Sequence, residues 1–135
     1  MKAVFADTWF WIALSNEADN YNAQALHLRK TLSHQYIVTT EEILVEFLTY
    51  FSSKGPEGRV KATQVVEAMM ESDIEILHQS HDSFIKGLTL YKVRPDKGYS
   101  LTDCISMQTM KAMAIQEALT HDHHFTQESF KILLN

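Results

Sequence analysis

The stretch "KAVFADTWFWIALSN", residues 2–16, contains the structural unit from which the fold can be predicted. Residues 2–7 form a short apolar run that predicts a buried strand ending at Asp7. The residues from Thr8 onward are typical of a helix, and Asp7 stands where the N-cap of that helix belongs. A buried strand that leads directly into a helix is the repeating unit of parallel sheets.

The same unit recurs along the whole chain. Further strands are expected at residues 35–40, 73–77, 116–120 and 130–134. Further helices are expected at residues 20–34, 39–51, 60–72, 81–93 and 101–114. This alternation predicts an α/β fold with a mainly parallel sheet that is covered by helices on both faces.

Local signals mark several helix boundaries. Residues 39–42, "TTEE", match a Thr-x-x-Glu capping box at the start of the third helix. Ser100 and Asp103 match a second capping box, at the start of helix 101–114. Residues 52–59, "SSKGPEGR", contain two glycines and a proline and predict a break between two helices.

Size and composition indicate one globular domain, residues 1–135. The chain is 45% apolar and 21% charged, which is ordinary for a globular protein. Cys104 is the one cysteine, so no intrachain disulfide can form and a reducing cytoplasm is the expected location. No membrane association is expected, because the longest early apolar run contains Asp7 and falls short of the roughly 20 residues that a span needs. Residues 2–7 also lack the features of a signal peptide.

The net charge of −5 bears on possible partners. Nucleic-acid binders usually carry a basic surplus, so this balance argues against tight, nonspecific binding to phosphates. It is compatible with an enzyme that approaches a phosphate through a cation held by carboxylates.

Two acidic residues are expected at the functional edge of the sheet. In open parallel sheets this edge lies at the carboxyl ends of the strands. Asp7 ends the first strand, and Asp122 follows strand 116–120 by two residues. Each also has a structural interpretation, Asp7 as a helix N-cap and Asp122 as a turn-forming residue in a polar loop.

Two further acids lie on helices. Glu46 lies just outside the apolar arc of its helix and can lean over the rim of the core, although an ordinary exposed glutamate would show the same pattern. Asp103 is aligned with Met107, Met110 and Ala114, and a carboxylate in such a stripe is costly to bury without a partner. Its structural alternative is the capping box with Ser100, which is compatible with ligand binding because the two carboxylate oxygens can serve different partners.

The stretch "ALTHDHHFTQ", residues 118–127, places three histidines around Asp122: His121, His123 and His124. They suggest a zinc site, but adjacent side chains do not easily all turn toward one ion. No His-x-x-x-His pair or cysteine completes a tetrahedral set. We therefore expect the histidines to belong to a polar loop, with one of them near the site.

These four acids, in this order, resemble those of the PIN-domain ribonucleases. The resemblance is closest to the small VapC-like toxins of bacterial toxin–antitoxin pairs. Four motifs carry it: "VFADTWFWIAL" (4–14), "VTTEEILVEFL" (38–48), "YSLTDCISMQTM" (99–110) and "ALTHDHHF" (118–125). Together they follow the family order and spacing over essentially the whole chain.

The resemblance implies a three-layer α/β/α sandwich and an endoribonuclease that hydrolyses RNA phosphodiester bonds. It implies that four carboxylates converge as catalytic residues and ligands of Mg²⁺ or Mn²⁺, as one or two ions: Asp7, Glu46, Asp103 and Asp122. Thr8 and Thr120 would orient carboxylates or water from behind these ligands. The histidines would shift the metal preference toward Mn²⁺, because imidazole suits softer ions than Mg²⁺.

Contacts to the RNA substrate would need basic side chains. One candidate group precedes Asp103: Lys92, Arg94 and Lys97. A second follows the third helix: Lys54, Arg59 and Lys61. Either group can hold RNA phosphates or simply be solvated surface charge. Tyr99 can stack on a base or pack in the protein.

Partner proteins are suggested by three adjacent aromatic residues, Trp9, Phe10 and Trp11. A helix cannot turn all three toward one core, so at least one is expected at a groove or a subunit interface. The resemblance implies a homodimer and a cognate antitoxin that docks across the early helices.

Other function classes fit parts of the pattern. A PIN-like binding module without catalysis, or an RNA-maturation nuclease without an antitoxin, would share the fold. A receiver-like signalling domain would carry an adjacent pair of acids after its first strand, whereas this chain has Asp7 alone there.

Overall fold

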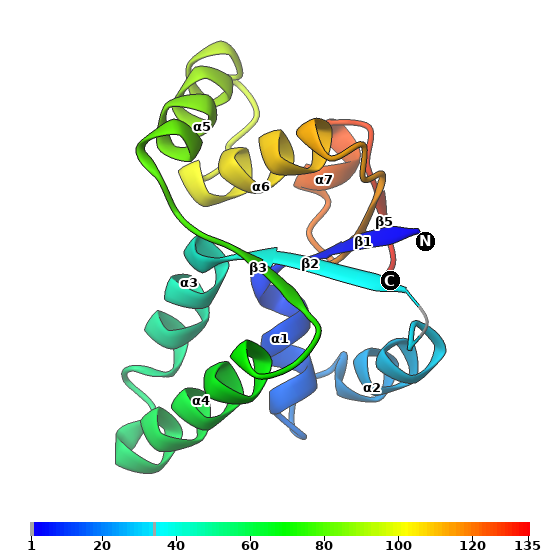
Figure 1. The fold of residues 1–135 in the computed structure, drawn as a ribbon, viewed down its shortest axis with the longest axis vertical. Coiled ribbons are helices and arrows are strands. Elements are labelled where there is room, and N and C mark those ends of the chain that lie inside the picture. The colour runs from blue at the N-terminus through cyan, green and yellow to red at the C-terminus, as the bar shows by residue number, and fades with distance from the viewer. Residues whose placement is uncertain (1, 34) are drawn as a thin grey trace.

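The computed structural model describes residues 2–33 and 35–135, which form an α/β fold around a five-stranded sheet (Figure 1). The strands are β1 (Ala3–Ala6), β2 (Tyr36–Thr40), β3 (Glu75–Leu77), β4 (Glu117–Leu119) and β5 (Lys131–Ile132). Their order is β3-β2-β1-β4-β5, and every pairing among the described residues is parallel. The predicted parallel sheet is confirmed.

Helices cover both faces of this sheet (Figure 1). One face carries α1 (Thr8–Ser15), α2 (Asn22–Thr31), α3 (Glu41–Phe51) and α4 (Gly55–Met70). The other carries α5 (His81–Val93), α6 (Leu101–Ala112) and the single turn α7 (His124–Gln127). The three-layer α/β/α architecture is therefore confirmed. No helix in residues 2–33 and 35–135 has the length and apolar character to cross a membrane.

The central strand β1 shows why its sequence is an unbroken apolar run. Val4, Phe5 and Ala6 have no exposed surface, because each face of the strand is covered by a helical layer. Ala6 is in register with Leu119 of β4. The next residues on the two strands, Asp7 and Thr120, therefore leave the sheet side by side at its carboxyl edge.

The start of α3 differs from the predicted capping box. Thr40, rather than Thr39, is the N-cap, and its side chain accepts a hydrogen bond from the Ile43 amide at 3.2 Å. Thr39 is buried and its hydroxyl donates to the Ala6 carbonyl at 2.8 Å. Thr39 thus joins β2 to β1, a long-range contact that the local pattern did not contain.

The other boundaries differ from the predictions in several places. Helix α2 ends at Thr31, whereas the prediction extended to residue 34, which lies outside the described residues, and β5 is shorter than the strand expected at 130–134. The break expected at residues 52–59 is shorter, because α4 begins at Gly55 and Pro56 occupies its first turn, where a proline removes no helical hydrogen bond. Ala114 lies beyond the end of α6 with φ 56°, so it does not extend the stripe of Asp103. A helical turn, α7, replaces part of the loop expected around Asp122.

The aromatic run of α1 divides as predicted. Phe10 and Trp11 are buried, whereas Trp9 is 39% exposed. Trp9 lies against the ring of His121 with 5.3 Å between ring centroids, and His121 stacks on Tyr21 at 4.2 Å.

Candidate active site

The four predicted carboxylates come from four separate elements and gather at the carboxyl edge of the sheet. Asp7 follows β1, and Asp122 lies just beyond β4. Glu46 lies in the second turn of α3, and Asp103 in the first turn of α6. Their charges act on one another, since the Asp103 and Glu46 carboxylates both raise the pKa of Asp7.

Two buried threonines hold this group in place. The Thr120 hydroxyl donates to Oδ2 of Asp7 at 2.9 Å and accepts a hydrogen bond from the Asp122 amide at 3.1 Å. The Thr8 hydroxyl donates to Oε1 of Glu46. Thr120 thus links Asp7 to Asp122, and Thr8 links the start of α1 to α3.

Asp103 is placed by the capping box predicted from the sequence. The Ser100 hydroxyl accepts a hydrogen bond from the Asp103 amide at 3.0 Å, and Oδ2 of Asp103 accepts one from the Ser100 amide at 3.1 Å. Asp7 sits at the N-cap position of α1, but its side chain makes no capping bond there. The carboxylate of Asp7 is therefore directed to Thr120 and the acidic group.

Burial and mutual repulsion make this group costly to ionise. Burial, followed by the charge of Asp103, raises the pKa of Asp7 to about 7. Burial also raises the pKa of Glu46 and of Asp103, and the charge of Asp122 adds to both shifts. Among the described residues, no lysine or arginine forms an ion pair with any of the four. Such a group fits a divalent cation, which would relieve the repulsion.

The three histidines take different positions. His121 belongs to the aromatic stack with Tyr21 and Trp9. His123 is exposed. His124 turns inward, with its Nδ1 atom 3.3 Å from Oδ1 of Asp122 and 3.5 Å from Oδ2 of Asp103. Asp103, Asp122 and His124 each offer one ligand atom within 4.8 Å of the others, so one histidine does reach the acidic group.

Solved structures provide the comparison with known proteins. No protein-family model matches the chain, and no curated protein matches it by sequence. VapC20 of Mycobacterium tuberculosis, described as a Sarcin-Ricin loop cleaving toxin, is 25% identical and matches with a TM-score of 0.80 over 94% of this chain and 95% of that one. This chain has the fold of a VapC-like PIN domain. VapBC2 of Rickettsia felis, bound to a DNA fragment from their promoter, also matches, at 15% identity and a TM-score of 0.68 over 96% of each chain.

The basic residues considered for RNA binding in this VapC-like domain differ in exposure and in whether their side chains already contact other parts of the protein. Arg94 forms an ion pair with Glu128, whereas Lys92 is exposed and Lys97 is half-buried. In the second group, the Lys54 ammonium lies 5.0 Å from the centre of the Tyr50 ring. Arg59 donates to the Ser52 carbonyl at 3.2 Å, and Lys61 is exposed.

Glu128 is a positioning residue that the sequence interpretation missed. Its side chain is 5% exposed and accepts hydrogen bonds from Arg94 at 3.1 and 3.2 Å, from Lys111 at 3.0 Å and from the Tyr99 hydroxyl at 2.9 Å. These contacts join the segment after α7 to α6 and to the loop before Asp103. Tyr99 therefore has a packing role, being 5% exposed.

We expect the Glu128→Gln variant to unfold more easily at neutral pH, by about 2 kcal/mol, because it loses charge-assisted hydrogen bonds whose cationic partners are partly exposed. Burial opposes ionisation, but Arg94, Lys111 and Tyr99 outweigh it and lower the pKa of Glu128 to about 2, from 4.5. The wild-type advantage should therefore shrink as pH falls from about 4.5 toward 2. Urea unfolding at pH 7 and pH 3 measures it, and a pH-independent difference would contradict the ion-pair explanation.

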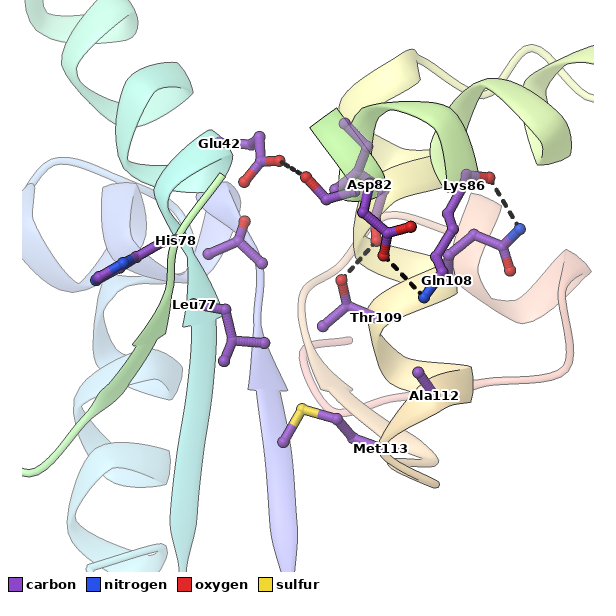
Figure 2. A pocket seen from close by; sticks show the side chains of 12 residues that line it. Glu42, Leu77, His78, Asp82, Lys86, Gln108, Thr109, Ala112 and Met113 are labelled. Carbon is purple, nitrogen blue, oxygen red and sulfur yellow. Dashed lines mark hydrogen bonds and ion pairs between the residues drawn. The ribbon is translucent and has the colours of Figure 1, made fainter. Parts of the chain in front are cut away.

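A separate cavity of about 180 Å³ lies between β3 and α3 on one side and α5 and α6 on the other (Figure 2). Several of its polar groups are bonded to one another. Ser83 donates to Glu42 at 3.0 Å, Lys86 pairs with Asp82 at 3.0 Å, and Gln108 donates to the Lys86 carbonyl at 3.0 Å. Glu42 therefore ties α3 to α5 instead of completing the predicted capping box. None of the four acids lines this cavity, so we place the candidate active site at the acidic group.

Proposed function

We propose that this chain is a metal-dependent endoribonuclease, a single domain spanning residues 1–135 that hydrolyses RNA phosphodiester bonds in the cytoplasm. The observation that carries the proposal is the convergence of Asp7, Glu46, Asp103 and Asp122 at one edge of the sheet, without a lysine or arginine partner among the described residues. The likeness to VapC20, itself described as a Sarcin-Ricin loop cleaving toxin, supports the same reaction class.

The proposed metal ligands are those that the family resemblance implies. Asp7, Glu46 and Asp103 would hold Mg²⁺ or Mn²⁺, and Asp122 would hold a second ion or orient the attacking water. When bound, a divalent ion supplies Lewis-acid stabilisation of the charge that develops on the phosphate. Thr120 fixes one oxygen of Asp7 by its hydrogen bond, and Thr8 fixes one oxygen of Glu46, so the remaining oxygens have defined directions.

The chain's own carboxylates also provide the base. A carboxylate in this group can accept a proton from the attacking water. The resulting hydroxide then approaches the phosphorus from the side opposite the leaving oxygen. Burial raises the pKa of Asp7 to about 7 in the metal-free group, which supports a carboxylate here as a proton acceptor near neutral pH. Lys92 and Lys97 are our candidates for contacts to flanking RNA phosphates, while Arg94 would serve mainly to hold Glu128.

We propose further that the chain acts as the toxin of a toxin–antitoxin pair, with a cognate antitoxin and a homodimeric state. The likeness to VapBC2, solved with DNA from their promoter, supports the antitoxin. The exposed Trp9 on α1 lies where the family resemblance places the docking of an antitoxin. An RNA-maturation nuclease without an antitoxin would share the site, and a neighbouring gene for a short DNA-binding protein would favour the toxin role over it.

The test of the enzymatic proposal is cleavage of a mixture of structured RNAs by the metal-stripped protein. We expect no cleavage in EDTA and restored cleavage when Mg²⁺ or Mn²⁺ is added in excess, because the four carboxylates repel substrate phosphates until a cation neutralises them. Gel analysis of labelled RNA gives the readout. Cleavage that persists in EDTA would refute the metal-dependent mechanism, and absence of cleavage with every ion would favour a binding module.

A further inference from the structure

The turn α7 gives His124 a fixed position beside the acidic group. Oδ1 of Asp122 accepts a hydrogen bond from the His124 amide at 2.9 Å, and the Asp122 carbonyl accepts one from the Phe125 amide at 3.2 Å. Phe125 has no exposed surface and anchors the turn in the core. The Tyr99 ring meets the His124 ring edge-on at 5.5 Å. The backbone and a neighbouring ring therefore both restrict the imidazole.

The inward nitrogen of this ring has no hydrogen-bond partner in the described part of the chain. Nδ1 of His124 is buried, although the side chain as a whole is 35% exposed. It faces one oxygen of Asp122 at 3.3 Å and one of Asp103 at 3.5 Å. An imidazole nitrogen that faces two carboxylates requires a proton or a cation between them, since otherwise three acceptors repel one another.

The spacing of these atoms suits a cation. Adjacent ligands of an octahedral ion, each about 2.1 Å from it, lie about 3 Å apart. The two separations from Nδ1 are a few tenths of an ångström longer than that, so a small closure would bring Nδ1 to ligand spacing from each carboxylate oxygen. The three ligand atoms lie within 4.8 Å of one another. A nitrogen among the oxygens favours Mn²⁺ and later transition ions over Mg²⁺, which prefers oxygen ligands.

We propose that His124 is a direct nitrogen ligand of the ion that Asp122 holds, with Asp103 shared between this ion and the one at Asp7 and Glu46, and that it makes this position select Mn²⁺-type ions over Mg²⁺. This assignment rests on the proposed function in one respect, that the acidic group binds a divalent ion. It distinguishes this chain from the all-carboxylate ligand set that the family resemblance implies.

The first experiment measures binding of Mn²⁺ and of Mg²⁺ to the metal-stripped protein by calorimetry. Loss of a residue that only holds a metal ligand in place typically costs 10- to 100-fold in metal affinity. Loss of a direct ligand should cost no less, so we expect His124→Ala to weaken Mn²⁺ binding by at least about tenfold. Mg²⁺ binding should change by less than about threefold, because Mg²⁺ gains little from imidazole. The matched control is His123→Ala, the exposed neighbour, which should bind both ions as the wild type does.

The second experiment tests the bond itself. Pulsed EPR of Mn²⁺ bound to the wild-type protein should show coupling to a directly bonded ¹⁴N nucleus, and His124→Ala should lose that signal. Bound Mn²⁺ without nitrogen coupling, or an affinity for Mn²⁺ that His124→Ala leaves unchanged or raises, would overturn the assignment and indicate a protonated histidine paired with the carboxylates. An equal loss of affinity for Mg²⁺ and Mn²⁺ would overturn the selectivity for Mn²⁺-type ions.

These outcomes separate the two proposals. If Mn²⁺ binds without nitrogen coupling while RNA cleavage stays metal-dependent, the histidine assignment fails and the nuclease stands. If neither ion binds at all, both fail. If Mn²⁺ binds through nitrogen but no RNA is cut, the metal ligand stands and the nuclease proposal fails.

Discussion

The Asp103→Asn protein is expected to cleave RNA at least about 10³-fold more slowly than the wild type, the loss produced by roughly 4 kcal/mol of missing transition-state stabilisation. The amide removes one negative charge from the acidic group and replaces a ligand oxygen with a nitrogen that carries no available lone pair. It should leave α6 intact, because the Ser100 hydroxyl bonds the backbone amide of residue 103 and an amide oxygen can accept from the Ser100 amide.

Single-turnover cleavage at saturating metal measures this effect. The control is Asp82→Asn, which makes the same chemical change at an exposed acid of α5 outside the acidic group. Asp82→Asn should cleave at the wild-type rate, and thermal unfolding should show both variants folded. If Asp103→Asn retained its activity, the catalytic site would have to lie elsewhere.

The strands and helices could be predicted from sequence because their signals are local. The buried run that ends at Asp7 and the capping box of Ser100 and Asp103 each lie within a few residues, and both are present in the structure. The convergence of Asp7 and Asp122 follows from a single further rule. Asp7 and Asp122 each follow a strand, and parallel strands bring their carboxyl ends to the same edge of the sheet.

What the sequence did not reveal depends on contacts between distant residues. Glu128 and Arg94 are an ordinary acid and an ordinary base in the sequence, and only the fold shows that they pair and that the Glu128 side chain is almost buried. Thr39 matched a capping pattern, but pairing of β2 with β1 directs it to Ala6. In the sequence, His124 could not be distinguished from the other two histidines, because its inward orientation depends on the turn α7. The apolar Phe125 that follows was the one local sign that the loop turns into the core.

The Asp7→Asn protein is expected to be more stable than the wild type when both are free of metal at pH 8. In the folded state, burial and then the charge of Asp103 raise the pKa of Asp7 to about 7, whereas an unfolded chain would have a value near 3.8. The folded protein therefore binds a proton that the unfolded chain releases. This linkage stabilises the wild type below about pH 4 and is lost as pH rises to about 7. The loss at pH 8 is on the order of 4 kcal/mol.

An asparagine avoids this loss because it is neutral at every pH, and its side-chain oxygen can still accept the hydrogen bond from Thr120. We expect the difference in free energy of unfolding to be close to zero near pH 4, to grow up to about pH 7 and to remain constant above it, with a difference in Tm on the order of 10 °C at pH 8. The exposed Asp96→Asn variant should follow the wild-type pH dependence.

The last part of this experiment repeats the unfolding measurements with added metal. Excess Mn²⁺ should raise the Tm of the wild type more than that of Asp7→Asn, because a cation relieves in the wild type the repulsion that the amide has already removed. Urea or thermal unfolding from pH 4 to pH 8, with and without Mn²⁺, gives all of these differences. If Asp7→Asn were less stable than the wild type at pH 8 without metal, then Asp7 would not be a strained buried charge. Stability would in that case come from the contacts of the carboxylate itself, and metal would not be needed to make the acidic group tolerable.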